Sequence, residues 1–372
     1  MCSSDLSYIQ AVNESLRIAM ETDPNVIVMG EDIAGGAGRP DKEDAWGGPM
    51  RLTKGLIGQF GADRVRDTPI SEAGFVGAGV GAAASGLRPV VDLMYVSFYG
   101  VCADQITNNA AKMHYMFGGK VKVPLTIMTG IGAGTNSAAQ HSETLYSIFT
   151  HFPGLKCVVP SNPYNAKGLM TAAIRDDDPV IVFNNRQLMG LRFEDHVPED
   201  SYIVDIGKSD FKTQGEDITL LGIGYTTRVC MEAASILEKQ GYSVEVLDLL
   251  SLSPMDEDAI LSSVQKTRKI VIVDEDYPRC SIASDISALV AEEAFDYLDA
   301  PPKRVTAPHT QVPYSRPLEA LFVPTKEKVV ASALEEDRKS VVEGRRVDLG
   351  GRRIIKKKSK TQHTQIRQQD TQ

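Results

Sequence analysis

The chain has 372 residues, of which 42% are hydrophobic, and this length is enough for two ordinary domains with separate cores. The formal net charge of −9 argues against an enzyme of nucleic acids, and no apolar run is long enough to span a bilayer. The five cysteines are scattered without a CxxC pair, which argues against a disulfide framework or a zinc site and favours a reducing compartment. We therefore expect a cytoplasmic protein with no membrane or nucleic-acid partner.

Strands and helices alternate along the first half of the chain. Apolar residues at helical spacing predict a first helix over 7–22, and short apolar runs predict buried strands between the later helices. We expect helices at 7–22, 52–60, 71–86, 97–113 and 163–175, and strands at 26–29, near 65, and at 88–94, 124–128, 157–159 and 180–183. This alternation predicts a domain over 7–185 with a parallel sheet covered on both faces.

The second half repeats this alternation after a polar, irregular segment at 186–215, which we interpret as a linker. We expect strands at 218–222, 243–249, 269–273 and 304–306, and helices at 227–240, 256–264, 282–294 and 325–336. They predict a second, smaller domain over 216–336. The predicted fold class is therefore α/β, with two doubly wound sheet domains.

The C-terminal residues differ from the rest in composition. Residues 337–372 hold eleven Lys or Arg against four Asp or Glu, and they end in a string rich in Gln and Thr. Such a segment has little to bury, so we expect a basic, disordered tail, with nucleic-acid binding as the weaker alternative. Because the body shares none of this composition, we expect residues 337–372 and 1–6 to be non-native sequence.

Residues 71–86 predict a helix built almost wholly of glycine and alanine. Glycine inside a helix costs about 0.5–1 kcal/mol relative to alanine, so its repeated use needs a reason. We interpret the glycines as a close-packing surface for a partner or symmetry-related helix. Glu72 stands in the first turn, where it either complements the helix dipole or points at a ligand.

Chemically distinctive side chains follow several strands of the first predicted sheet. Ligands of such sheets bind beyond the carboxyl ends of the strands, so Glu31, Glu72 and His141 are expected to converge there. His141 is either a polar structural residue or an acid–base group. Phe98 is either part of the core or a stacking face for a ligand ring. The acidic turn at 176–178 is either solvated or a cation site.

Short motifs occur in a fixed order over 7–335: Gly30-Glu31-Asp32, Asp67-Thr-Pro-Ile-Ser-Glu72-Ala-Gly-Phe, Gly86-Leu-Arg-Pro-Val90, Tyr115-Met-Phe-Gly-Gly119, Ala138-Ala-Gln-His141-Ser and Phe152-Pro-Gly-Leu-Lys156. In order and spacing they resemble the beta subunit of thiamine-diphosphate-dependent 2-oxo acid dehydrogenases. The loops Gly35-Gly-Ala-Gly38, Asp44-Ala-Trp-Gly-Gly48, Arg279-Cys-Ser-Ile-Ala-Ser-Asp285 and Thr306-Ala-Pro-His-Thr310 are similar to the acetoin dehydrogenase branch.

The resemblance implies a transketolase-like pyrimidine-binding domain followed by a transketolase C-terminal domain, with thiamine diphosphate as cofactor. In the family, the residue matching Glu72 hydrogen-bonds the aminopyrimidine ring and favours the tautomer that starts proton removal. Phe98 matches the aromatic residue that packs on this ring, and Met94 is expected beside the cofactor. Glu31 matches an acid at the cofactor that belongs to the proton path between paired active sites. His141 matches the histidine that assists acyl transfer to lipoate.

The resemblance also implies a structural potassium ion. The positions that match its site are Leu125, Ala173, Ile174, Asp176 and Asp178, and most of them contribute backbone carbonyl oxygens. The family's diphosphate-and-magnesium motif, Gly-Asp-Gly, does not occur in this chain. Thiamine diphosphate and its magnesium ion would therefore need an alpha subunit, and the chain alone would catalyse nothing.

The resemblance implies a heterotetramer of two alpha and two beta chains, docked on a lipoyl acyltransferase core. The expected reaction is the cleavage of acetoin with transfer of the acetyl unit to lipoyl-lysine. The alternative is oxidative decarboxylation of pyruvate or a branched-chain 2-oxo acid by the same scaffold. A non-catalytic scaffold subunit is disfavoured, because it would have no use for Glu72, Phe98 and His141 together at strand ends.

Overall fold

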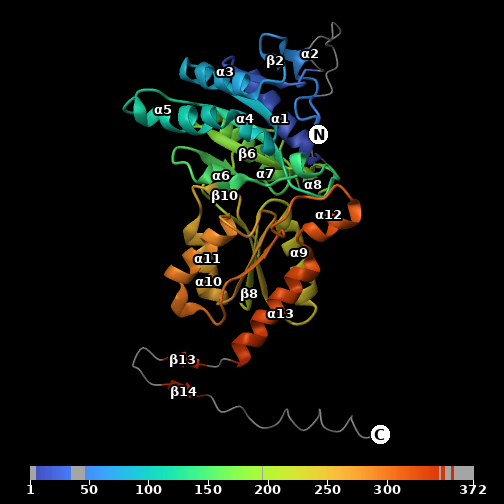
Figure 1. Cartoon of the computed structure of the whole chain (residues 1–372), viewed down its shortest axis with the longest axis vertical. Helices are drawn as coiled ribbons and strands as arrows, with labels where there is room; N and C mark the ends of the chain where they lie inside the picture. The colour runs from blue at the N-terminus through green and yellow to red at the C-terminus, as the bar shows by residue number, and fades with distance from the viewer. Residues whose placement is uncertain (1–5, 35–46, 195, 343–344, 348–352, 356–372) are drawn as a thin grey trace.

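The computed structural model describes residues 6–34, 47–194, 196–342, 345–347 and 353–355, and places them around two separate sheets (Figure 1). The first domain, drawn mostly from blue to green, lies above the second, drawn from yellow to red. Both sheets are mainly parallel and covered by helices, so the predicted α/β class with two doubly wound domains is confirmed. Within these residue ranges, no helix is long and apolar enough to cross a membrane.

The first sheet has seven strands in the order β10-β5-β6-β4-β3-β1-β2. They are β1 (Val26–Glu31), β2 (Val65–Thr68), β3 (Arg88–Tyr95), β4 (Thr126–Ile131), β5 (Lys156–Val158), β6 (Val180–Asn185) and β10 (Ser251–Ser253). All neighbours pair in parallel except β10, which comes from the second half of the chain and runs antiparallel to β5. Strands β4 and β6 are buried along their whole length, as expected for a parallel sheet with two covered faces.

Helices pack on both faces of the first sheet. On one face lie α1 (Tyr8–Thr22) and α7 (Pro163–Arg175), and on the other lies α3 (Glu72–Ala84); alternate residues of β1 belong to the two core clusters. α1 begins at a capping box formed by Ser7 and Gln10, and α7 begins at an Asn162 cap. These caps explain why both helices begin where the sequence predicts. The short helices are α2 (Leu56–Phe60), α6 (Tyr146–Thr150) and α8 (Arg186–Met189).

The long helix expected at 97–113 is interrupted in the structure. The segments are η2 (Val96–Phe98), α4 (Tyr99–Asp104), a π-helical η3 (Gln105–Ala110) and α5 (Ala111–Met116). The Thr107 hydroxyl donates to the carbonyl four residues before it at 2.8 Å, and the Asn109 side chain donates to the carbonyl five residues before it at 3.1 Å. Side chains that bond to the preceding turn compete with the backbone ladder and bend helices. Apolar spacing does not reveal this competition.

The glycines of α3 have different surroundings. A Cβ atom at Gly79 would lie 2.7 Å from Cγ2 of Val91, so this glycine lets α3 approach β3 closely within the chain. At Gly81 a Cβ atom would meet nothing within 4 Å. Packing inside the chain therefore explains Gly79, whereas a partner helix at Gly81 stays a prediction.

The second sheet has five strands in the order β12-β11-β8-β9-β7. They are β7 (Asp210–Thr213), β8 (Ile218–Gly222), β9 (Val244–Asp248), β11 (Ile270–Asp274) and β12 (Lys303–Thr306), all parallel to their neighbours except β7. The helices are α9 (Tyr225–Glu238), α10 (Glu257–Thr267), α11 (Ile282–Glu293), α12 (Arg316–Phe322) and α13 (Lys326–Val342). The segment 186–215 is therefore not only a linker, because it supplies α8 and the edge strand β7. Four residues are too short to show a strand period.

The predicted boundary at residue 336 falls inside α13, which continues to Val342. Beyond it, β13 (Arg345–Val347) and β14 (Arg353–Ile355) pair antiparallel. In these parts the structure differs from the expected disordered tail. The sequence between 335 and 339 consists of acidic and basic helix formers, which allow a helix to continue. The other residues of 337–372, and 1–5, lie outside the described part of the chain.

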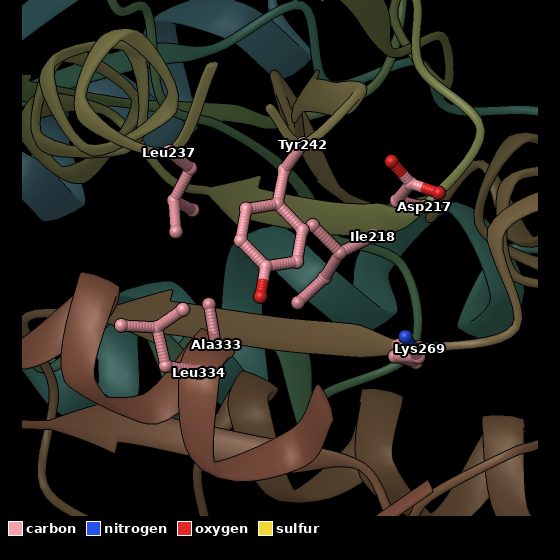
Figure 2. Close-up of a pocket in the computed structure, with 7 residues that line it drawn as sticks. All are labelled: Asp217, Ile218, Leu237, Tyr242, Lys269, Ala333 and Leu334. Carbon is pink, nitrogen blue, oxygen red and sulfur yellow. The ribbon is translucent and has the colours of Figure 1, made fainter. Parts of the chain in front are cut away.

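A small pocket lies between α13 and the second sheet (Figure 2). Its empty space is about 200 Å³, part of it open to solvent, which is less than a typical ligand pocket of about 300–1,000 Å³. The Tyr242 ring points from the loop before β9 toward α13 and fills the space beside Ile218. The lining is completed by Asp217, Leu237, Lys269, Ala333 and Leu334. We interpret it as a packing gap that α13 covers.

Three consecutive acids connect the two domains. Asp274 is the last residue of β11 in the second domain, Glu275 and Asp276 follow it directly, and all three are buried. First-domain side chains donate hydrogen bonds to them: Tyr146 to Asp274, Asn185 and Gln187 to Glu275, and Ser147 to Asp276. All these donors are neutral. Burial raises the pKa of Glu275 to about 8 and that of Asp276 to about 7, with a further increase from the charge of Asp274.

Candidate active site

The predicted site residues meet at one edge of the first sheet, where neighbouring parallel strands end together. Glu31 is the last residue of β1 and pairs with Thr68 of β2, and α3 begins shortly afterwards at Glu72. Tyr95 is the last residue of β3 and pairs with Gly130 of β4. The carboxyl ends of four strands thus surround the entrance to α3.

Glu72 is a nearly buried carboxylate, 7% exposed, at the first position of α3. It makes no hydrogen bond to any described residue, although buried polar groups normally find partners. Its charge acts on Cys102 of α4, because the pKa of that thiol is raised to about 12, first by burial and then by Glu72. A carboxylate that only complemented the helix dipole would be more stable in water. Glu72 is therefore available to a ligand.

Glu31 lies beside Glu72 and is only partly exposed. Its pKa is raised by burial and then by the neighbouring charges of Asp32 and Glu72. A carboxyl group whose ionised form is disfavoured in this way holds its proton more readily than an isolated one. The shift at Glu31 therefore shows that the charge of Glu72 reaches it.

Three aromatic rings form a cluster at the same edge of the sheet, beyond the ends of β3 and β4. The centroids of Tyr95 and His141 are 4.6 Å apart, and Phe98 lies 5.6 Å from His141 and 5.5 Å from Tyr95. All three pairs have edge-to-face geometry, which stabilises such contacts. The buried hydroxyls of Ser97 and Ser142 have no hydrogen-bond partner among the described residues. The structure thus brings together Phe98 and His141, and adds Tyr95.

Met94 has a strained backbone at this edge, with φ of +63°. Its N–H donates to the Asp92 carboxylate at 2.8 Å, and the pairing of β3 with β4 shifts register here. Burial raises the pKa of Asp92 to about 6. A positive φ at a bulky residue is costly and is typical of functional sites. The residue with the strained backbone, Met94, is thus the one that the resemblance places beside the cofactor.

Arg186, the first residue of α8, was not among the residues expected in the site. Its Nη1 donates to the His141 carbonyl oxygen at 2.5 Å, and its Nη2 donates to the Ser137 hydroxyl at 2.9 Å. Its guanidinium carbon lies 5.0 Å from the centre of the Tyr95 ring, a cation–π distance. Arg186 directly follows β6, so the strand-end argument that selected Glu31 also applies to it.

Comparison with known proteins identifies the family of the chain. Residues 4–191 match the transketolase, pyrimidine binding domain, and residues 207–329 match the transketolase, C-terminal domain. The acetoin:2,6-dichlorophenolindophenol oxidoreductase subunit beta of Bacillus subtilis (strain 168) is 53% identical over 332 residues, which cover 89% of this chain and 96% of that protein. The chain belongs to the transketolase-like family of dehydrogenase beta subunits.

Other members of this beta-subunit family are also similar to the chain. The Cupriavidus necator protein with the same name is 49% identical over 328 residues, covering 88% of this chain and 96% of that protein. The 2-oxoisovalerate dehydrogenase subunit beta of B. subtilis is 39% identical over 333 residues, covering 89% and 98%. A solved structure titled split gene transketolase, inactive beta4 tetramer, has a TM-score of 0.71 at 18% identity, covering 90% and 99%, and it supports the fold alone.

Parts of the loop that resembles the acetoin branch lie outside the described residues of this beta subunit. Residues 35–46, with Gly35-Gly-Ala-Gly38 and most of Asp44-Ala-Trp-Gly-Gly48, are not described. Gly48 is described, and a Cβ atom there would lie 3.8 Å from the Asp92 carboxylate. This branch loop therefore ends beside the strained end of β3.

The positions expected to hold potassium lie near the amino ends of β4 and β6, away from the active site. Arg88 donates to the carbonyl oxygens of Ile174 (3.1 Å) and Asp176 (2.9 Å), and Lys156 pairs with the carboxylates of Asp176 (2.7 Å) and Asp178 (3.1 Å). The Leu125 carbonyl accepts a sheet hydrogen bond. No group of three or more His, Cys, Asp or Glu suited to a metal occurs in the described ranges.

Proposed function

We propose that the chain is the beta subunit of a thiamine-diphosphate-dependent acetoin dehydrogenase. The complex would cleave acetoin, release acetaldehyde and transfer the acetyl unit to the lipoyl-lysine of an acyltransferase core. The observation that carries the proposal is 53% identity, across both domains, to a beta subunit whose name specifies acetoin. Relatives named for 2-oxoisovalerate and for pyruvate are 36–41% identical.

The described residues fit the pyrimidine half of thiamine diphosphate. Glu72 is a nearly buried carboxyl group that makes no hydrogen bond to a described residue, and a ring nitrogen would provide a partner. The Phe98 carbonyl accepts from the Cys102 thiol, and the charge of Glu72 contributes to the raised pKa of that thiol. These two observations support the expectation that Phe98 packs on the ligand that Glu72 binds. When bound, the cofactor supplies the carbon nucleophile that attacks the substrate carbonyl.

The chain's own residues would orient the reactants and move protons. Glu72 would hold a proton in a hydrogen bond to the pyrimidine ring, and Met94 would approach the ring through its half-buried backbone near the end of β3. Glu31 would exchange protons with Glu72, since their charges already interact. His141 would assist acyl transfer, since its imidazole lies against two rings and makes no hydrogen bond to any described residue.

An alpha subunit would complete the site. The sequence contains no Gly-Asp-Gly motif, so the diphosphate and its magnesium ion would be held by the other chain of an alpha2-beta2 heterotetramer. The chain also exposes large apolar side chains near Glu72: Ile70 is 76% exposed and Val101 is 61% exposed. Such apolar exposure is typical of subunit contacts.

The potassium ion stays a proposal for the carbonyl oxygens of Leu125, Ala173 and Ile174, and for Asp176 and Asp178. Carbonyl oxygens have two lone pairs, so those that already accept from Arg88 can also bind an ion. The carboxylates of Asp176 and Asp178 fit less well as ligands, because both face Lys156. The expected ligands of the potassium ion are therefore mainly backbone carbonyl oxygens.

Substrate turnover tests the proposed function directly. The chain would be reconstituted with an alpha subunit, thiamine diphosphate and magnesium, and dye reduction would be measured with acetoin, pyruvate and 2-oxoisovalerate. We expect kcat/KM for acetoin to exceed the others by at least roughly tenfold, a difference of about 1.4 kcal/mol in transition-state binding. Turnover of a 2-oxo acid without turnover of acetoin would refute the assignment and favour the decarboxylating alternative.

A further inference from the structure

The segment that carries His141 has an unusual backbone. Between β4 and η4 (Ala139–His141), φ is positive at Gly132 (+96°), Gly134 (+96°), Asn136 (+55°) and Ala138 (+59°). Glycine and asparagine adopt such angles readily, whereas alanine does so only under strain. A strained conformation persists only where surrounding contacts impose it. The residues that hold this segment therefore determine where His141 lies.

Glu319 provides the main contact, and it comes from the second domain. It lies on α12 and is 2% exposed. Its carboxylate accepts hydrogen bonds from the Gly134 N–H at 2.8 Å, the Asn136 N–H at 2.9 Å and the Asn136 side-chain amide at 2.7 Å. A carboxylate only accepts hydrogen bonds, so it satisfies three donors that converge from one loop. Glutamine at this position would turn an NH₂ group toward them.

Two arginines complete the support. Arg186 of the first domain holds the far end of the segment through the His141 carbonyl and the Ser137 hydroxyl. Arg316, on the same helix as Glu319, donates to the Asn136 side-chain oxygen at 3.1 Å. The charges of Arg186 and Glu319 also interact with each other. The segment therefore lies between a carboxylate of one domain and a guanidinium of the other.

Apolar contacts also hold this segment against the second domain. Ala133, next to Gly132, belongs to a small buried cluster whose other members come from the second domain. Those members are Ala307, Val312, Phe322 and Val323. The second domain therefore contacts the segment through both polar and apolar groups.

We propose that Glu319 is a positioning residue, which fixes the strained segment between β4 and η4 so that the second domain sets the position of the His141 imidazole. The inference rests on the proposed function, in which His141 assists acyl transfer. Glu319 does not touch the reacting atoms. It acts by holding Gly134 and Asn136, while Arg186 holds His141 itself.

Hydrogen exchange tests the structural half of the proposal without any activity measurement. In the assembled complex, Glu319→Gln should raise the exchange rate of peptides covering 132–138 by about tenfold or more, because two backbone N–H groups lose a charged acceptor. The control is Glu327→Gln, which changes an exposed carboxylate on α13 and should leave this exchange unchanged. Unchanged exchange in Glu319→Gln would refute the proposal.

A double-mutant cycle tests the functional half. We expect Glu319→Gln to slow acyl transfer to lipoamide by on the order of 10–100-fold, since a small misplacement of a catalytic group has effects of this size. In a His141→Ala background the same substitution should change the rate less than about twofold, because both changes act through one group. Equal effects in both backgrounds would overturn the positioning role.

Two further measures keep the outcomes distinguishable. If Glu319→Gln does not fold, Asn136→Gly removes the side-chain donor from the loop and tolerates the positive φ, and the same two results are expected. If the wild-type complex does not turn over acetoin, the proposed function fails, and the cycle is measured with the 2-oxo acid that it accepts. If only the positioning role is wrong, the complex is active, and the effects of Glu319→Gln and His141→Ala on the rate of acyl transfer are additive.

Discussion

Glu72 and Glu319 are both nearly buried carboxylates, but their surroundings are opposite. Glu319 accepts hydrogen bonds from Gly134 and Asn136, whereas Glu72 makes no hydrogen bond to a described residue. Buried acceptors without partners are unfavourable and are normally completed by a ligand or by water. Glu72 is therefore the carboxylate with capacity for a ligand, and Glu319 has a structural role.

This difference predicts the effect of Glu72→Gln. The substitution keeps the size of the side chain and removes no hydrogen bond to a described residue, so the thermal midpoint should not fall by more than about 1–2 °C. Activity of the reconstituted complex should fall by on the order of 10²–10⁴-fold, because an amide cannot exchange the proton. Steady-state dye reduction with acetoin measures it. Wild-type activity in this variant would show that Glu72 has no catalytic role.

Some site residues could be predicted from the sequence because strand ends converge. Glu31, Glu72 and His141 follow predicted strands, and the strand-end rule placed them together. Arg186 follows β6 and could have been found in the same way. Glu319 could not, because it reaches the loop from α12 of the other domain, and no local pattern indicates such a contact.

Helix α3 combines two kinds of glycine. Gly79 faces the sheet, where a Cβ atom would lie 2.7 Å from Val91 and 3.3 Å from Leu125. Gly81 faces outward, with nothing within 4 Å of a Cβ atom. The same residue type thus fulfils a packing requirement at one position and none within the chain at the other.

The two positions give a matched pair of substitutions. Gly79→Ala should lower the free energy of unfolding by about 1–3 kcal/mol, because overpacking exceeds the gain in helix propensity. Gly81→Ala should raise it by about 0.5–1 kcal/mol. Chemical denaturation of the chain measures both. If Gly81→Ala also prevents assembly with the alpha subunit, the outer face of α3 is a subunit contact, and intact assembly argues against the partner-helix interpretation.

Element boundaries were predictable where a local signal was present. Asn162 and Pro163 mark the start of α7, which runs over the expected residues 163–175. The helix expected at 97–113 is present over 96–116, but a π-helical segment at 105–110 divides it where Thr107 and Asn109 bond to carbonyls of the preceding turn. Such side-chain competition depends on rotamers, which apolar spacing does not contain.

The contact between the domains makes the whole molecule sensitive to pH. The folded-state pKa is raised to about 8 for Glu275 and about 7 for Asp276, and it is also raised for Asp274. Ordinary unfolded values are about 4, so the folded chain binds more protons between roughly pH 4 and pH 8. Their contribution to stability is therefore complete below pH 4 and is lost as the pH rises toward 8. The titratable groups that face them are Glu143, Tyr146, Tyr225 and Tyr277; no described Lys or Arg pairs with the three acids.

Glu275→Gln tests this dependence. The amide cannot ionise, so the decrease in thermal midpoint between pH 5.5 and pH 8.5 should be smaller in the variant than in the wild type, by about 2–4 °C. Thermal unfolding at both pH values measures it, with Glu327→Gln as an exposed control. An identical decrease in wild type and Glu275→Gln would mean that Glu275 does not titrate in this interval.

The two-domain α/β organisation could be predicted because it follows from alternating long elements. The edge strands β7 and β10 could not, since they have four and three residues and carry no period. The contacts of Asp274 and Glu275 with the first domain could not be predicted either, because their partners Tyr146 and Asn185 lie far away in the sequence. Long-range pairings of this kind depend on the packed structure.

Strand β10 also affects how the chain can fold during synthesis. The first sheet is completed by Ser251–Ser253, which pair with the open edge of β5 after only the first part of the second domain has been made. Until these residues leave the ribosome, the nascent first domain exposes an unpaired edge, a common starting point for aggregation. The first domain therefore lacks one strand of its sheet until residues 251–253 have been synthesised. Its sheet is completed only when the second domain begins to form.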